Sequence, residues 1–556
     1  MTAQPDQSAA VAGALDESSA RPWFPLVIIV LAQLQLATNV SALPVSLGPI
    51  SAELDAPATA AATALLIYSL CVAAFVMMGA KVGKIIGERL VFQVSIVVHL
   101  LAMALMAVSG NVTTMNLAQA ISGIAAAAMV PTLVVLVAAN YHGRQQATAL
   151  GVLAGIPAVA SALTFVLAGF LATAFSWRYS YWLIVALGVV VFVLSFRLTP
   201  IPRQRGVRID AVGVLLSAAA IALILYGFNN LQSWGLLAAR PAAPFSVLGV
   251  SPAPILVVVG IVLGQAFLAW SNRRVGAGRQ PLLALEVMAS REEKSAVIAF
   301  LVAGSLSLAV GFLIPLYVQI TQGRTPLASA VAILPYAAAV AVAGVLSVRL
   351  YGRLSPRRLG VASFILIAIG LVVAAFTVGH TWSTVAVILG LLLVGIGEGT
   401  LLTLLFNVLV SASPKHLAGD VGALRGVANN VSNALGAAFS SVVAVGLLGV
   451  FLALGYSSTD LPAKLQLPQA AGEVDFVTSS ELTRQLTARS ATPHQIREAV
   501  ATNQEAGLRA LRSSFLIVGA LSLLAIFPAA RLPGYVPGEL SADAILAADA
   551  ADEPDQ

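Results

Sequence analysis

Residues 383–410 read STVAVILGLLLVGIGEGTLLTLLFNVLV, a run with a single charged residue, Glu398. Its apolar side chains follow one another without the alternation of a half-buried strand. The run is also much longer than the roughly ten residues of a barrel strand. A helix needs about 20 mostly apolar residues to cross a bilayer. The run therefore predicts a membrane-spanning helix.

The same pattern recurs along the whole chain. Its 556 residues are 59% hydrophobic and 10% charged, whereas soluble proteins carry about 25% charged residues. Together with the first run, the apolar runs predict an all-α membrane protein of about fourteen spans, grouped as six, two and six. The other runs lie near 24–48, 57–79, 90–109, 115–139, 146–174, 179–197, 211–231, 253–271, 295–320, 327–350, 359–378, 420–454 and 511–530.

Lysine and arginine are unevenly divided between the segments that join these runs. If the N-terminus lies inside, the inner segments hold 21 of them, and the short outer loops hold only Arg178, Arg240 and Arg324. Positive residues concentrate on the cytoplasmic side of membranes. We therefore expect both termini in the cytoplasm and the chain in a bacterial-type plasma (inner) membrane. The net charge of +6 is spread over these segments, so it predicts no nucleic-acid-binding patch.

The order of the runs predicts the domains. The N-terminal six-helix bundle covers 23–199, two extra spans cover 200–272, and the C-terminal six-helix bundle covers 295–531. The remaining segments are a cytoplasmic tail over 1–22, a cytoplasmic linker over 273–294, an external loop over 455–510 and a disordered cytoplasmic tail over 532–556.

Two short segments carry helix signals outside the spans. Residues 281–294 mix apolar and charged side chains, which predicts a short helix along the inner surface. Thr492, Pro493 and Gln495 match a capping box with proline at the first helical position, so a helix is expected to start there and run toward the last span.

Polar side chains inside the spans are candidates for binding substrate. In the first, fourth and thirteenth runs they fall on one narrow stripe of a helix. Such residues either hold helices together or line a solvated path, and both interpretations stay open. The candidates are Gln35, Thr38, Asn39, Gln119, Asn407, Asn429, Asn430 and Asn433.

Glu398 is the only carboxylate deep inside any predicted span, and glycines flank it. Loss of water favours the protonated form of a carboxyl group, so Glu398 could take up and release a proton as a cavity opens to each side. The alternative is a structural carboxyl bonded to a neighbouring helix. His99 offers a second route for protons, although a packed neutral histidine explains it as well.

The sequence carries no signature of an enzyme. It contains no phosphate-binding loop and no nucleophile–histidine grouping, and its five histidines lack the spacing of a metal site. We expect no cofactor and no metal. The expected partners are a small-molecule substrate, the lipid bilayer and protons, and the expected state is a monomer.

Several motifs resemble the major facilitator superfamily, specifically its fourteen-helix drug:proton antiporter branch. They are Ser176-Trp177-Arg178-Tyr179, Ile314 to Gln319 with Gln322-Gly323, Leu334-Pro335, Ala42-Leu43-Pro44 and Pro131. The resemblance covers nearly the whole chain. It implies two six-helix bundles with two extra helices outside them, a path lined by helices 1, 2, 4, 5, 9, 10, 12 and 13, and binding near the midplane. It also implies export of amphipathic or drug-like molecules by alternating access.

Departures from the branch limit what the resemblance implies about proton coupling. Gln35 stands where the branch has an aspartate, and Gln119 stands where it has an arginine. Residues 80–88 stand where the branch has a loop motif with an aspartate, and no alignment of them puts an acid at that aspartate. Residues 164–169 keep only part of the antiport motif. Proton coupling would therefore fall to Glu398. The alternatives are an exporter of lipid-like molecules, an uncoupled facilitator, and a non-transporting receptor or scaffold.

Overall fold

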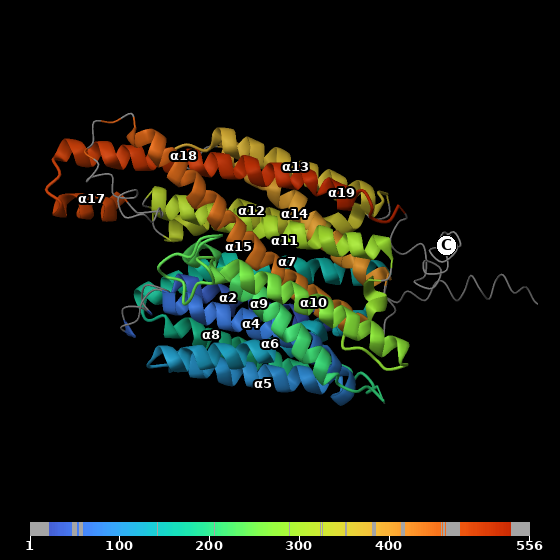
Figure 1. Cartoon of the computed structure of the whole chain (residues 1–556). Coiled ribbons are helices and arrows are strands. Elements are labelled where there is room, and N and C mark those ends of the chain that lie inside the picture. Colours follow the sequence, from blue (N-terminus) through green and yellow to red (C-terminus); the bar gives the residue numbers. More distant parts are fainter. Residues whose placement is uncertain are drawn as a thin grey trace, which may run out of the picture.

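The computed structural model describes residues 22–46, 50, 53–54, 59–141, 143–204, 206–288, 290–322, 324, 326–350, 353–380, 385–412, 417–457, 459, 462 and 479–534. They form a bundle of long helices that run roughly side by side (Figure 1). Fourteen of the helices are long and apolar enough to cross a membrane. The predicted all-α class and the predicted number of spans are therefore confirmed.

The helices divide into two halves and an extra pair. The N-terminal half consists of α2 (Phe24–Val45), α4 (Thr59–Ile86), α5 (Glu88–Ala107), α6 (Val112–Asn140), α7 (Gly143–Ala174) and α8 (Arg178–Ser195). The C-terminal half consists of α11 (Arg291–Leu316), α12 (Pro326–Leu346), α13 (Pro356–Thr377), α14 (Val385–Ala412), α15 (Ala418–Tyr456) and α18 (Pro493–Leu524). The extra pair, α9 (Ala211–Trp234) and α10 (Pro252–Gly276), packs on α4 and α15 through α9.

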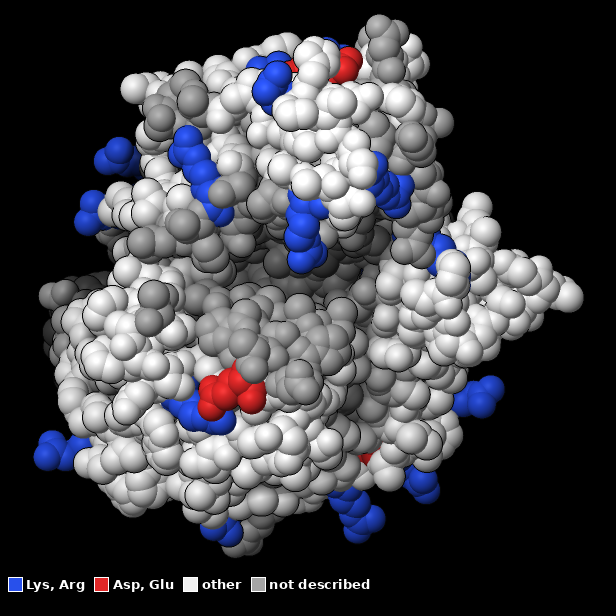
Figure 2. Space-filling model, turned by 90° about the vertical axis from the view of Figure 1, so that its left-hand side faces the viewer, with Lys and Arg blue, Asp and Glu red and all other residues white. Residues whose placement is uncertain are grey.

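The two halves touch through α7, which packs on α12 and α14, and through α4 and α6, which pack on α15. Small residues let these backbones approach. A Cβ added at Gly151 would lie 2.8 Å from the carbonyl oxygen of Gly344, and one added at Gly422 would lie 2.9 Å from Cα of Pro131. Figure 2 faces the end of the molecule that carries α17 (Ser479–Ala488), and there a hollow separates the halves.

At the same end, α17 and the start of α18 extend beyond the other helices (Figure 1). The capping box expected at Thr492 is confirmed, because its hydroxyl accepts a bond from Gln495 N and the Gln495 side chain accepts one from Thr492 N. Leu452, Tyr456 and Leu482 belong to a small apolar core that joins this extension to the end of α15.

The linker differs from the single helix expected over 281–294. The chain makes a 3-10 turn at Leu285–Met288, and α11 begins at Arg291. Ser290 Oγ accepts a hydrogen bond from Glu293 N at 3.0 Å, and the Glu293 carboxylate accepts one from Ser290 N at 3.1 Å. This capping box starts the spanning helix, so the charges assigned to a surface helix lie in its first turn instead.

Candidate functional site

A network of neutral polar side chains lies inside the N-terminal half. Asn39 of α2 and Gln119 of α6 exchange two hydrogen bonds of 3.2 Å, and Asn39 also donates to Ser122 at 3.2 Å. Gln35 Nε2 lies 2.9 Å from His99 Nδ1 on α5. All five side chains are buried. Of the predicted binding residues, Asn39 and Gln119 are thus bonded to each other between helices, whereas Gln35 Oε1, like His99 Nε2, is buried without a partner among the described residues.

Thr38 lies apart from this network, on the floor of an apolar cleft of about 220 Å³ between α2, α7 and α8. Its hydroxyl accepts a hydrogen bond of 3.3 Å from Thr164. Leu163 and Leu167 line the cleft and are about half exposed. Because such side chains on a spanning helix face acyl chains, the cleft opens sideways toward the bilayer.

Glu398 is buried on α14 inside the C-terminal half. The Tyr336 hydroxyl of α12 donates a hydrogen bond of 2.6 Å to Glu398 Oε2, and Ser307 of α11 lies 3.1 Å from that hydroxyl. The other carboxyl oxygen, Oε1, is buried and has no partner among the described residues. A carboxyl group in this setting is able to carry a proton without losing a protein contact.

Glycines beside Glu398 explain this close packing. A Cβ at Gly395 would lie 2.5 Å from the Tyr336 carbonyl oxygen, and one at Gly397 would lie 2.7 Å from that of Ser363 on α13. Any larger residue at either position would push these helices away from α14. The two glycines therefore set the distance between the carboxyl group and Tyr336.

The four asparagines predicted to bind substrate divide into two pairs. Asn407 and Asn430 each donate a hydrogen bond of 2.9 Å to the carbonyl four residues earlier in their own helix. Asn429 is exposed and Asn433 is partly buried, and the described residues offer neither of them a hydrogen bond. Only the second pair keeps its amide groups available to a ligand.

A cluster of buried charges joins the halves at the end where α4 finishes and α15 starts. The Asp420 carboxylate of α15 forms ion pairs with Lys81, at 3.0 Å, and with Lys84, both on α4. It also accepts a bond of 3.2 Å from Ala284 N in the linker. One carboxylate thus ties both halves and the linker together.

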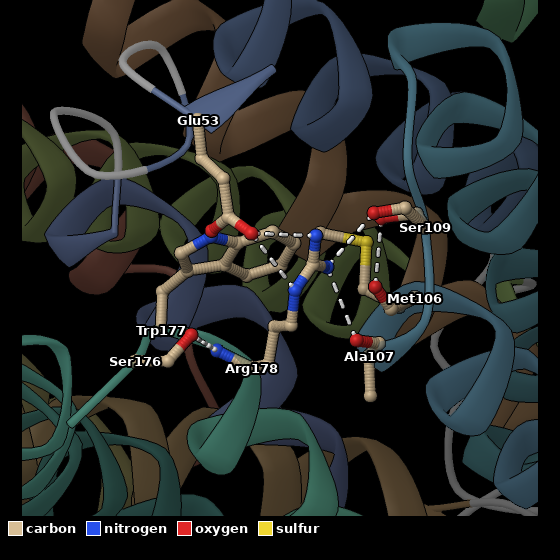
Figure 3. A network of polar contacts seen from close by, with 7 residues as sticks. All are labelled: Glu53, Met106, Ala107, Ser109, Ser176, Trp177 and Arg178. Atoms are coloured by element: carbon tan, nitrogen blue, oxygen red, sulfur yellow. Dashed lines mark hydrogen bonds and ion pairs between the residues drawn. The ribbon is translucent and has the colours of Figure 1, made fainter.

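A second charge network lies at the opposite end of the N-terminal half (Figure 3). Glu53 accepts hydrogen bonds from Trp177 Nε1 at 2.6 Å and from Arg178 Nη2 at 2.9 Å. Arg178 also donates to the carbonyl oxygens of Ala107, the last residue of α5, and of Ser109. The Ser-Trp-Arg motif therefore fastens the start of α8 to the end of α5.

Sequence reasoning missed three groups of this arrangement. Tyr336 reaches Glu398 from another helix, and no spacing in the sequence indicates that contact. Asp420 lies in the first turn of α15, and nothing in the sequence indicates that the two lysines of α4 pair with it. Arg425 is one of the 21 basic residues that the sequence places in inner segments, but it lies inside α15. A basic residue between two apolar stretches was the available signal for Arg425.

Comparisons with known proteins agree with this architecture. The family model of the Major Facilitator Superfamily matches residues 29–437. The puromycin resistance protein pur8 of Streptomyces alboniger is 27% identical over 82% of this chain and 87% of its own length. The multidrug efflux pump LfrA of Mycolicibacterium smegmatis is 24% identical over 82% of this chain and 86% of its own.

Solved structures show the same fold at low identity. The human organic anion transporter MFSD10 aligns with a TM-score of 0.54 and 12% identity over 91% of this chain and 99% of that one. The proton:xylose symporter XylE aligns with a TM-score of 0.52 and 11% identity over 91% of this chain and 94% of that one. The chain is thus a membrane transporter rather than an enzyme, and it belongs to the Major Facilitator Superfamily.

Proposed function

We propose that this transporter exports amphipathic, drug-like small molecules across the plasma membrane by alternating access. The observation that carries the proposal is the arrangement of the two halves. Charged and glycine contacts close one end, and a hollow lies between the halves at the other (Figure 2). A scaffold would have no need of such a path. Resistance and export proteins among the relatives support the choice of substrate class.

Proton coupling through Glu398 is the proposed energy source. Glu398 is surrounded by Tyr336 and Ser307 in the C-terminal half, and its orphan oxygen favours a protonated carboxyl. When the hollow closes and the opposite end opens, water would reach Glu398 and stabilise its charged carboxylate form instead. Rocking of the halves would then couple proton release to substrate movement.

Lipid-like substrates are the second candidate, and one observation favours them. The apolar cleft above Thr38 opens toward acyl chains, so an amphipathic molecule dissolved in the bilayer could enter there without crossing water. Drug-like and lipid-like compounds share this amphipathic chemistry, and the panel in the following experiment includes both.

An efflux assay tests the proposed function. Cells that lack the gene receive either the wild-type gene on a vector or the empty vector. Both are loaded with chemically diverse compounds, and the amount of each compound that the cells retain is followed. Wild-type cells should retain at least one amphipathic compound less than vector cells do. If the protein is present in the membrane and no compound in the panel is exported, the transport proposal is contradicted.

Orientation is also part of the proposal, with both termini in the cytoplasm and 455–510 outside. It rests on the uneven division of lysine and arginine. Single cysteines at Ser457 and Ser541 should label differently in intact cells, after removal of Cys71. An impermeant thiol reagent should label Ser457→Cys only. Labelling of Ser541→Cys alone would reverse the topology.

A further inference from the structure

Arg425 is a cation inside a spanning helix without an acidic partner. Its guanidinium carbon lies 4.3 Å from the centre of the Phe406 ring on α14. The side chain is partly buried, and no carboxylate in the described part of the chain lies within ion-pair distance of it. Charges inside a membrane are costly unless they meet a partner or water. Arg425 therefore requires a compensating group that the described residues do not supply.

The two nearby carboxylates are engaged elsewhere. Asp420 stands five residues before Arg425, on a different face of α15, and is held by the two lysines of α4. Glu398 is enclosed within the C-terminal half by its bond to Tyr336. Neither is placed to neutralise the guanidinium.

Long side chains near helix ends often snorkel to the membrane surface, but Arg425 does not. Phe406 stands six residues before Ala412, the last residue of α14. This separation is about 9 Å along the helix axis. The guanidinium stacks at that depth. It is therefore held away from the end of α14 in a partly buried setting, where the electrostatic attraction to an anion is stronger than in bulk water.

The neighbouring face of α15 points across the hollow between the halves. Gly422 and Gly426 contact α6 and α4 of the N-terminal half. Asn429 stands seven residues after Gly422, and Asn433 stands seven residues after Gly426. Seven residues are about two helical turns, so the two asparagines lie on the same face of α15 as the two glycines. Asn429 lies about 16 Å along the axis from the start of α15, well inside this 39-residue helix. An exposed amide at that depth, with no hydrogen bond, indicates a solvated space rather than lipid.

We propose that Arg425 and Asn429 bind the anionic group of the transported substrate, so that the substrates are amphipathic anions. The inference rests on the proposed function and names its substrate class. Arg425 and Asn429 are one helical turn apart on α15. The Phe406 ring holds one face of the guanidinium, which leaves its N–H edge to meet a carboxylate or phosphate in a bidentate geometry. Asn429 adds a neutral donor one turn further along α15.

The test compares two fluorescent probes that differ only in charge, dansylglycine and dansylglycinamide. Binding is measured on the purified full-length protein in nanodiscs of phosphatidylcholine, for the wild type, Arg425→Gln, Arg425→Lys and the exposed-arginine control Arg273→Gln. The wild type and Arg273→Gln should prefer the acid by about tenfold or more, the size expected for charge-assisted hydrogen bonds. Arg425→Gln should lose that preference and still bind the amide, and Arg425→Lys should keep part of it.

Three results would overturn the inference. They are a wild type that binds neither probe, a wild type that prefers the amide, and an Arg425→Gln protein with an unchanged preference for the acid. Probe binding does not depend on transport, so a chain that prefers the acid but exports nothing contradicts the proposed function alone. Phosphatidylglycerol in the nanodisc separates two sources of the anion. Competition with dansylglycine indicates a lipid headgroup, and no competition indicates a soluble anion.

Discussion

The N-terminal and C-terminal halves share one helical plan, but the polar groups buried along their helices differ in charge. In the N-terminal half, Asn39 and Gln119 bond to each other and Gln35 meets His99, but Gln35 Oε1 and His99 Nε2 are buried without a partner among the described residues. In the C-terminal half, Glu398 Oε1 likewise has no partner among the described residues, and Arg425 stacks on the Phe406 ring. A network of neutral groups favours one packing of the helices, whereas a buried ionisable group responds to protons and ligands. We therefore propose that the N-terminal half supports the fold and that the C-terminal half binds protons and substrate.

The largest expected effect concerns the joint between the halves. Asp420→Ala leaves Lys81 and Lys84 buried without a partner, which is expected to lower the free energy of unfolding by about 3–5 kcal/mol. Thermal unfolding of the purified protein in detergent measures the loss. A change of less than about 1 kcal/mol would show that the joint contributes little.

A matched control separates the lost ion pair from general disruption at this position. The triple variant Lys81→Met, Lys84→Met and Asp420→Leu replaces the three paired charges with apolar side chains and leaves the buried Glu88, which neighbours Lys84, in place. Such replacements are often neutral or stabilising, so the triple variant should recover most of the stability that Asp420→Ala loses. Failure to recover would indicate that packing, rather than charge, governs this site.

A smaller effect should distinguish the amides of the two halves. Asn39→Leu leaves Gln119 without its buried partner and should cost about 1–3 kcal/mol of stability. Asn429→Leu breaks no bond within the described protein, so its stability should stay within about 0.5 kcal/mol of wild type. Transport per folded molecule should show the reverse order, with the loss at Asn429. Equal stability losses in the two variants would remove the proposed contrast.

The smallest effect is expected at the network of Figure 3. Glu53 and Arg178 are both partly exposed, so solvent screens their attraction, and Glu53→Gln should cost at most about 1 kcal/mol. The loss should shrink in about 1 M salt. Unfolding at low and high salt measures it. A salt-independent loss of several kcal/mol would mean that this end is a main joint instead.

Elements that depend on local sequence were the most predictable. Apolar runs of spanning length predicted all fourteen candidate spans, and the Thr492 capping box predicted the start of α18. The linker over 281–294 was mispredicted, although Ser290 and Glu293 carry the same capping signature. That signature was overlooked because the mixed composition of the segment suggested a surface helix.

Contacts between distant helices could not be predicted. The burial of Glu398 could be predicted because this carboxylate interrupts a long apolar run. Its hydrogen bond to Tyr336 could not, because it joins α14 to α12, which are separate in the sequence. The amide stripe of α2 was equally readable, whereas its partners on α5 and α6 depend on how the bundle rotates each helix. A single sequence thus shows which face of a helix is polar, but it does not show which neighbouring helix packs against that face.

Gradient-driven transport by Glu398→Gln tests the central claim most directly, because glutamine imitates the protonated carboxyl with little change in shape. Wild type and variant are reconstituted into liposomes, and uptake of a compound from the efflux assay is measured with and without an imposed pH gradient. We expect the gradient to accelerate uptake by the wild type and to have no effect on uptake by Glu398→Gln, while the variant stays folded and binds substrate. A variant with wild-type gradient-driven uptake would contradict the account, and it would favour an uncoupled facilitator or a proton route through His99.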